Sequence, residues 1–131
     1  MTVPPGHRPF SDAILAESTT SIATTPVAAS MVAPCNGFLH KVYAASNGTF
    51  TGTITVKVTI SSSTSTDVTS GTLTIAAGSG VQSVSVEIPK TVMANGLSMV
   101  PVNDGDLITF TPSGGTGASI PGAFTAVIRE F

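Results

Sequence analysis

The eight residues Thr53-Ile-Thr-Val-Lys-Val-Thr-Ile60 alternate strictly between polar and branched apolar side chains. The apolar members share one face of an extended chain: Ile54, Val56, Val58 and Ile60. Three threonines and Lys57 share the opposite face. A period of two with one apolar face is typical of an antiparallel strand that packs on a core and meets solvent on its other side. This stretch therefore predicts a β-protein.

The same alternation recurs along the chain. It predicts strands at 72–75 and 83–88, and further strand patterns occupy 38–43, 106–111 and 123–131. Between these runs lie dipeptides that tolerate positive φ, such as Asn47-Gly48 and Asp104-Gly105. Several short strands separated by turns, with little helix signal, predict an all-β fold: an antiparallel β-sandwich, jelly-roll-like, over residues 35–131.

Two segments differ from this pattern. Residues 1–34 contain five prolines and a Ser/Thr-rich run, which favours extended and turn conformations over a central strand. We therefore expect an extended N-terminal arm over 1–34, in which 12–17 forms either one helical turn or a short strand. The stretch Pro89–Gly96 is the one internal helix candidate, one or two turns ended by Gly96.

Charged residues make up only 9% of the chain, against about 25% in ordinary soluble domains. Roughly a quarter of the residues are Ser or Thr, so the exterior is expected to be mostly neutral hydroxyls and small side chains. The five cations are scattered and the net charge is −2, which argues against nucleic-acid binding. No apolar run reaches the roughly 18 residues of a membrane helix, and residues 1–10 lack a signal-peptide pattern, so we expect synthesis in the cytoplasm.

Few residues offer chemistry. His7 and His40 are far apart, and we interpret His40 as an ordinary strand histidine. The acidic cluster Asn103-Asp-Gly-Asp106 could ligate a cation, but we favour a hairpin turn with a self-hydrogen-bonding Asp. Cys35 is the only cysteine, which excludes an internal disulfide, and we interpret it as a small buried apolar residue.

The Gly-rich stretch Pro112-Ser-Gly-Gly-Thr-Gly-Ala-Ser119 lacks the Lys and the following helix of a phosphate-binding loop. We expect a long exposed loop at an edge of the sandwich, where a partner or a sugar would be recognised. No Gly-x-Ser-x-Gly motif provides a serine nucleophile. The sequence predicts no catalytic, cofactor-binding or metal site, and we do not expect an enzyme.

The run from Cys35 to Phe131 resembles small tailed-bacteriophage head decoration, or cement, proteins. The resemblance is an ordered set of motifs, opened by Gly37-Phe-Leu-His-Lys-Val-Tyr-Ala-Ala-Ser-Asn-Gly48 and Thr53-Ile-Thr-Val-Lys-Val58. Next come Gly71-Thr-Leu-Thr-Ile-Ala76 and Val102-Asn-Asp-Gly-Asp-Leu-Ile108. Ser113-Gly-Gly-Thr-Gly-Ala118 and Phe124-Thr-Ala-Val-Ile-Arg129 complete the set.

The resemblance implies a structural virion protein on the exterior of an icosahedral phage capsid, made in the host cytoplasm. It would clamp neighbouring major capsid proteins, as a homo-oligomer that is a dimer or a trimer, without cofactors, nucleic acid or membrane. Two alternatives stay open: a carbohydrate-binding or adhesin-type β-sandwich, and a fibre or spike subunit. The single Tyr and the absence of Trp count against sugar stacking.

Overall fold

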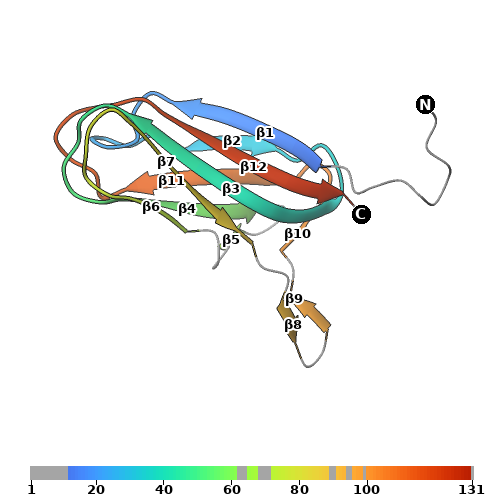
Figure 1. The fold of residues 1–131 in the computed structure, drawn as a ribbon. Coiled ribbons are helices and arrows are strands. Elements are labelled where there is room, and N and C mark those ends of the chain that lie inside the picture. The colour runs from blue at the N-terminus through green and yellow to red at the C-terminus, as the bar shows by residue number, and fades with distance from the viewer. Residues whose placement is uncertain are drawn as a thin grey trace, which may run out of the picture.

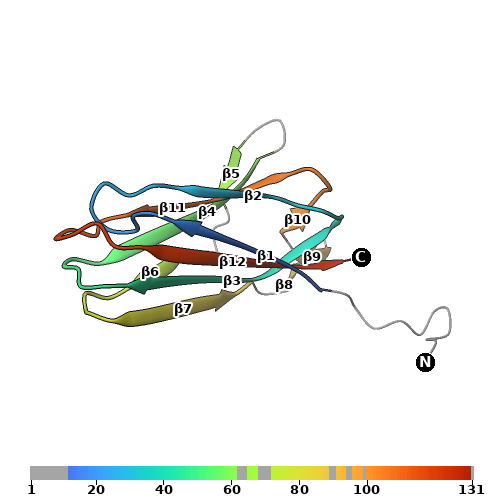
Figure 2. The ribbon, with the colours of Figure 1, turned by 90° about the horizontal axis from the view of Figure 1, so that it is seen from above.

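The computed structural model describes residues 12–61, 65–67, 72–88, 91–93, 96–98 and 100–130. Most of these form two antiparallel sheets packed face to face (Figures 1 and 2), and residues 91–93 and 96–98 form a separate two-stranded sheet. Sheet A has the order β1 (Asp12–Thr19), β12 (Gly122–Glu130), β3 (Gly37–Asn47), and both β7 (Val81–Glu87) and β10 (Pro101–Val102) pair with β3. Sheet B has the order β2 (Ala29–Val32), β11 (Leu107–Ser113), β4 (Ile54–Ser61), and both β5 (Ser65–Asp67) and β6 (Leu73–Ile75) pair with β4. The predicted all-β sandwich is confirmed.

The core lies between the sheets and follows the alternation read from the sequence. All four apolar residues of β4 are buried: Ile54, Val56, Val58 and Ile60. Phe110 of β11 and Phe124 of β12 are almost fully buried, and their rings stack between the two layers with centroids 5.0 Å apart. The strands expected near 38–43, 53–60, 72–75, 83–88, 106–111 and 123–131 are all present.

The N-terminal segment departs from the expected division into arm and sandwich. Residues 12–34 belong to the sandwich, because β1 is the edge strand of sheet A and β2 is the edge strand of sheet B. Pro26 and Pro34 lie outside both strands, so neither removes a donor from a ladder. The boundary at residue 35 therefore does not separate an arm from the sheets, and residues 1–11 lie outside the described part of the chain.

The expected helix at 89–96 is wrong. Residues 91–93 and 96–98 instead form a hairpin of β8 (Thr91–Met93) and β9 (Gly96–Ser98), in which Thr91 pairs with Ser98. Thr and Val at the start of this segment are β-branched and favour extended backbone, which outweighs a helix signal only two turns long.

The strand predicted over 106–111 extends further than expected, because β11 continues through Pro112 to Ser113. Pro112 is opposite Val56 of β4, whereas β2 pairs only with residues 107–110 of β11. The missing N–H of Pro112 therefore falls where β11 has no partner on its other side, a position at which proline is tolerated. No helix among the described residues is long and apolar enough to span a membrane.

Candidate interaction surface

Four loops meet at one end of the sandwich, on the left in Figure 1. They are residues 20–28, 48–53, 76–80 and 114–121, here called the loop end. None of these residues is Lys, Arg, Asp or Glu, and most are Gly, Ala, Ser or Thr. The loop end gathers segments that are almost 100 residues apart in the sequence, so only the topology of the two sheets creates this uncharged surface.

Backbone hydrogen bonds tie the loops to one another. Thr51 and Thr116 exchange both N–H···O=C bonds, at 2.9 and 2.8 Å, and their hydroxyl oxygens are 2.8 Å apart. The N–H of Phe50 donates to the carbonyl of Gly78 at 3.1 Å. Three of the four loops are therefore joined by ladder-like bonds, which makes the Gly-rich segment a fixed structure rather than a free loop.

The fourth loop, 20–28, is joined to the Gly-rich segment in the same way. The N–H of Ile22 donates to the carbonyl of Ile120 at 2.9 Å, and that of Thr24 donates to the carbonyl of Ala118 at 3.3 Å. Thr25 has a φ of 48°, which is unfavourable for a β-branched residue and persists only where the surroundings impose it. These contacts hold the loop end in one conformation.

Apolar side chains close the core beneath these loops. The side chains of Ile22, Phe50 and Ile120 are buried, and each comes from a different loop. Gly115 lies so close to this layer that a Cβ there would be 2.7 Å from Cγ1 of Ile54 and 2.9 Å from Cα of Ala23. The glycine at 115 is thus required by close packing, whereas its exposed neighbours form the outer surface.

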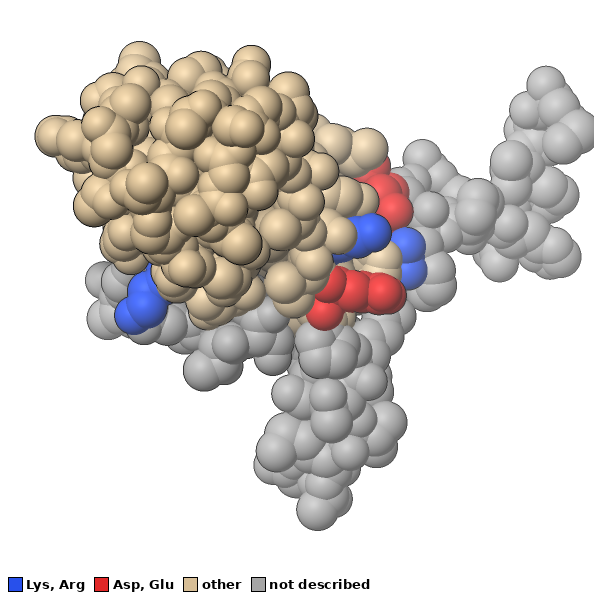
Figure 3. Space-filling view, turned by 60° about the vertical axis from the view of Figure 1, so that its left-hand side comes forward, with Lys and Arg blue, Asp and Glu red and all other residues tan. Residues whose placement is uncertain are grey.

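Charged side chains gather mainly at the opposite end of the molecule (Figure 3). There the guanidinium of Arg129 donates to both carboxylate oxygens of Asp12, with Nε 3.0 Å from Oδ1 and Nη2 3.3 Å from Oδ2. This hydrogen-bonded pair lowers the pKa of Asp12 below 3.8. The molecule is therefore polarised, with the Asp12–Arg129 ion pair at one end and a neutral surface at the other.

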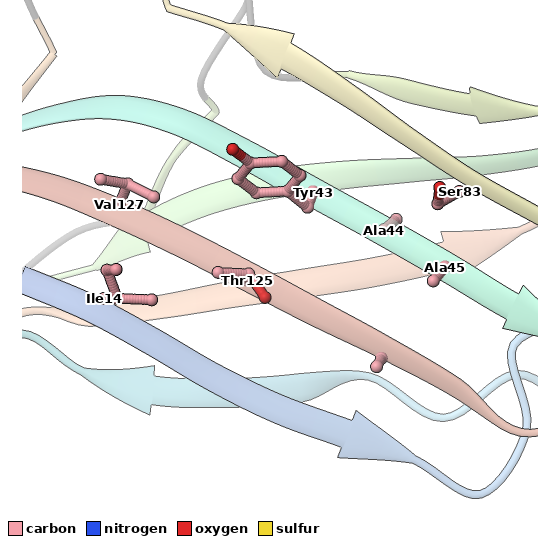
Figure 4. Close-up of a pocket in the computed structure, with 8 residues that line it drawn as sticks. Ile14, Tyr43, Ala44, Ala45, Ser83, Thr125 and Val127 are labelled. Carbon is pink, nitrogen blue, oxygen red and sulfur yellow. The ribbon is translucent and has the colours of Figure 1, made fainter.

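The outer face of sheet A carries two shallow hollows that lead toward the loop end. The larger, of about 430 Å³, is lined mainly by apolar and hydroxyl side chains, among them Ile14, Tyr43, Thr125 and Val127 (Figure 4). The smaller, of about 290 Å³, includes Val81 and Pro121 in its lining. Ala45 and Ala123 line both hollows, so the two are continuous.

Tyr43 is the one aromatic side chain in these hollows, and its ring is already engaged. The ammonium of Lys41 lies 5.0 Å from the centroid of the Tyr43 ring, a cation–π contact. A sugar that stacked on this side of the ring would have to displace the ammonium. The outer face offers aliphatic and hydroxyl groups for contact, with limited room for ring stacking.

The acidic cluster expected at 103–106 forms a turn that binds itself. The N–H of Asp106 donates to the carbonyl of Asn103 at 2.9 Å, and the Asp106 carboxylate accepts the N–H of Asn103 at 3.0 Å. Gly105, with a φ of 91°, supplies the positive φ that the turn requires. The self-hydrogen-bonding Asp is confirmed, but the turn joins β10 of sheet A to β11 of sheet B and is not a hairpin.

The remaining candidates are scattered. His40 is in β3, where its carbonyl accepts the N–H of Ile88 at 2.8 Å, and His7 lies outside the described residues. Cys35 is half-buried against the core, and burial raises the pKa of its thiol. Among the described residues, no three His, Cys, Asp or Glu side chains come together to hold a metal ion.

No local sequence pattern marks the loop end as a surface. Only the Gly-rich segment has a distinctive composition, because the other three loops carry no recognisable motif. The signal that the sequence does offer is the complete absence of charged residues from all four loops.

No protein-family model matches this chain, and no curated protein matches it either.

Proposed function

We propose that this chain is a structural protein that binds a repeating protein surface through its loop end. One observation carries the proposal: four loops without a charged residue are hydrogen-bonded into a single rigid surface. The cores of protein interfaces are depleted in charged residues, because each buried charge must lose its hydration. A fixed surface also loses little conformational entropy when it binds.

The partner we propose is the outer surface of an icosahedral phage capsid, where the chain would stabilise neighbouring major capsid proteins. The resemblance of residues 35–131 to head decoration proteins supports this choice of partner. A capsid presents many identical sites, so a modest contact at each site stabilises the whole shell when every site is occupied. A neutral, hydroxyl-rich surface suits such contacts because its desolvation costs less free energy than that of a charged surface.

Sugar binding has less support than protein binding. A carbohydrate platform usually offers an aromatic ring for stacking, and the ammonium of Lys41 lies over the ring of Tyr43. The hydroxyl groups that line the larger hollow could form hydrogen bonds with a sugar. Binding to an array of immobilised glycans therefore distinguishes carbohydrate binding from capsid binding. Binding to glycans without binding to capsids would favour the adhesin-type alternative.

The test mixes the purified chain with capsid shells that lack it and measures bound copies by sedimentation. Ala118→Glu adds a charge to the exposed loop end and is expected to weaken binding by at least about tenfold. Thr111→Glu adds the same charge to the exposed outer face of sheet B and is the matched control.

The affinity for capsids should also change little between about 0.05 and 0.5 M salt, because salt screens pairs of charges and this interface lacks them. Equal binding by the two variants would contradict the proposal.

A further inference from the structure

The edge strand of sheet A has the features of a pairing surface. β1 spans Asp12–Thr19, and β12 is the one strand that pairs with it among the described residues. Its register with β12 is continuous from Asp12 to Thr19, so no bulge twists this edge away. No Lys or Pro lies within the strand. Its charged residues, Asp12 and Glu17, flank residues 13–16, which are all apolar. Proteins usually protect a long edge with one of these devices.

The register shows which backbone groups of β1 face outward. The N–H of Asn47 donates to the carbonyl of Pro121, so the odd-numbered residues at this end of β3 direct their backbone groups toward β12. Neighbouring residues of an antiparallel strand bond to opposite sides. Within β12, the odd-numbered residues near this end therefore face β3 and the even-numbered residues, including Ala126, face β1. Leu15 lies opposite Ala126, so the two are hydrogen-bonded partners. The backbone groups of Ile14 and Ala16 then face away from the sheet.

The neighbouring residue Ser18 agrees with this assignment. Its N–H donates at 3.2 Å to the carboxylate of Glu17 rather than to a residue of β12. A side chain thus satisfies the outward group at one end of the strand. Among the described residues, no group does the same for the outward N–H and C=O of Ile14 and Ala16.

We propose that β1 pairs antiparallel with β1 of a second copy of this chain, about a two-fold axis at Leu15. Ile14 and Ala16 of one copy then exchange N–H···O=C bonds with Ala16 and Ile14 of the other. The two sheets A become one continuous sheet across the axis. A two-fold contact of this kind closes on itself, so it produces a dimer and not a trimer or a polymer.

The charges of β1 are compatible with this register. Asp12 falls opposite Ser18 of the second copy, and Glu17 falls opposite Ala13, so no like charges meet across the pair. Asp12 also keeps its ion pair with Arg129 of its own copy, because that contact is on the outer face of sheet A with β12. The register is symmetric about Leu15 and brings no like charges together, so the geometry and the charges of β1 both fit a second copy.

The side chains support the same occupant. Leu15 points toward the core and is partly buried, so the two Leu15 side chains meet at the axis and cover one another. Ile14 is 70% exposed on the outer face, beside the larger hollow, and gains Ala16 of the second copy as a neighbour (Figure 4). The pairing thus covers apolar surface that the single chain leaves in water.

The dimer does not rest on the proposed function. β1 provides the dimer contact through its edge, whereas the capsid contact is assigned to the loop end. The antiparallel pairing places the two loop ends at opposite ends of the dimer, so each stays accessible. An isolated dimer could therefore exist whether or not the chain binds capsids. Capsid binding by a monomeric variant tests the proposed function separately.

The test measures the mass of the full chain in solution by light scattering and sedimentation across the micromolar range. Ile14→Lys places a charge beside the axis, opposite Ala16 of the second copy. Val81→Lys is its control, because Val81 is 76% exposed on the opposite edge of the same sheet. Ala16→Pro removes an N–H that faces away from β12, so the ladder within the chain is kept. Circular dichroism verifies that each variant is folded.

We expect the wild type and Val81→Lys to have twice the monomer mass of 13.1 kDa. Ile14→Lys and Ala16→Pro should be monomeric, with the dissociation constant raised at least about tenfold. A wild-type monomer or trimer overturns the proposal, and so does a dimer that survives both changes. If the wild type is a monomer and Ile14→Lys no longer binds capsids, β1 contacts the capsid. That result would also overturn the proposed dimer.

Discussion

The stacked rings of Phe110 and Phe124 provide the sharpest test of the packing between the two sheets. Phe110 belongs to β11 of sheet B and Phe124 to β12 of sheet A, so the pair spans the core. The centroids are 5.0 Å apart with 15° between the ring planes. Phe110 is 0% exposed and Phe124 is 1% exposed, so solvent cannot fill the space that a truncation leaves.

Phe124→Ala should lower the free energy of unfolding by about 3–5 kcal/mol, because it removes buried apolar surface and leaves a cavity. A domain of this size has a total stability of about 5–15 kcal/mol, so the loss is a large share of it. Phe110→Ala should cost a similar amount. The double variant should lose less than the sum, by the about 0.5–1.5 kcal/mol that a stacked aromatic pair contributes beyond burial.

Urea unfolding followed by far-ultraviolet circular dichroism measures these losses. With a slope of about 2 kcal/mol per M urea, Phe124→Ala should lower the midpoint by about 1.5–2.5 M. Val81→Ala is the control, because Val81 is 76% exposed and its truncation should cost less than about 0.5 kcal/mol. A loss below about 1 kcal/mol for Phe124→Ala, or strict additivity in the double variant, would refute the stacked arrangement.

Three further predictions concern the loop end and the charged end. Gly115→Ala should lower the free energy of unfolding by about 1–3 kcal/mol by thermal or urea denaturation, because the new Cβ overlaps Ile54 and Ala23, and an unchanged stability would contradict that packing. The pKa of Asp12 is lowered by Arg129, so the ion pair stabilises the fold above pH 3.8 and this contribution disappears as pH falls through the folded-state pKa; Asp12→Asn should therefore flatten the pH dependence of stability in that acid range, and an identical acid profile would count against the pair. Burial raises the pKa of the Cys35 thiol, so iodoacetamide should alkylate it more slowly at pH 8 in the folded chain than in urea, and equal rates would be inconsistent with its packing.

The central strands were predictable because their two faces differ in chemistry. In β4, each branched apolar residue is flanked by Thr or Lys, and this contrast fixes both the strand and its buried face. β1 lacks that contrast: Ile14 is exposed and Leu15 is turned inward, yet both are apolar. Its residues were therefore compatible with a helical turn or a strand, and pairing with β12 settles the matter.

The errors have a common physical origin in tertiary context. Prolines made 1–34 resemble an arm, but Pro26 and Pro34 lie outside β1 and β2, so neither removes a donor from a ladder. Pro112 is tolerated within β11 because β2 pairs only with residues 107–110 and does not extend to it. The sequence shows where a proline lacks an N–H. It does not show whether an adjacent strand would have accepted a hydrogen bond from that N–H.

The loop end could not be predicted from any one segment. Its four loops are joined by contacts such as Thr51 with Thr116 and Ile22 with Ile120, which link distant parts of the chain. The sequence shows the low overall charge, but only the fold shows that the charged residues are segregated away from the loop end. The sequence indicated a surface suited to assembly, and the fold adds where that surface is uncharged and rigid.

Electron cryomicroscopy of capsid shells mixed with the purified chain tests the central claim most directly. We predict stoichiometric decoration of the shell exterior, with residues 20–28 and 114–121 of the bound copy against the capsid protein. In that arrangement the Asp12–Arg129 pair, at the opposite end, points away from the shell. Shells that remain undecorated, or chains attached through the charged end, would contradict the assignment of the loop end as the binding surface.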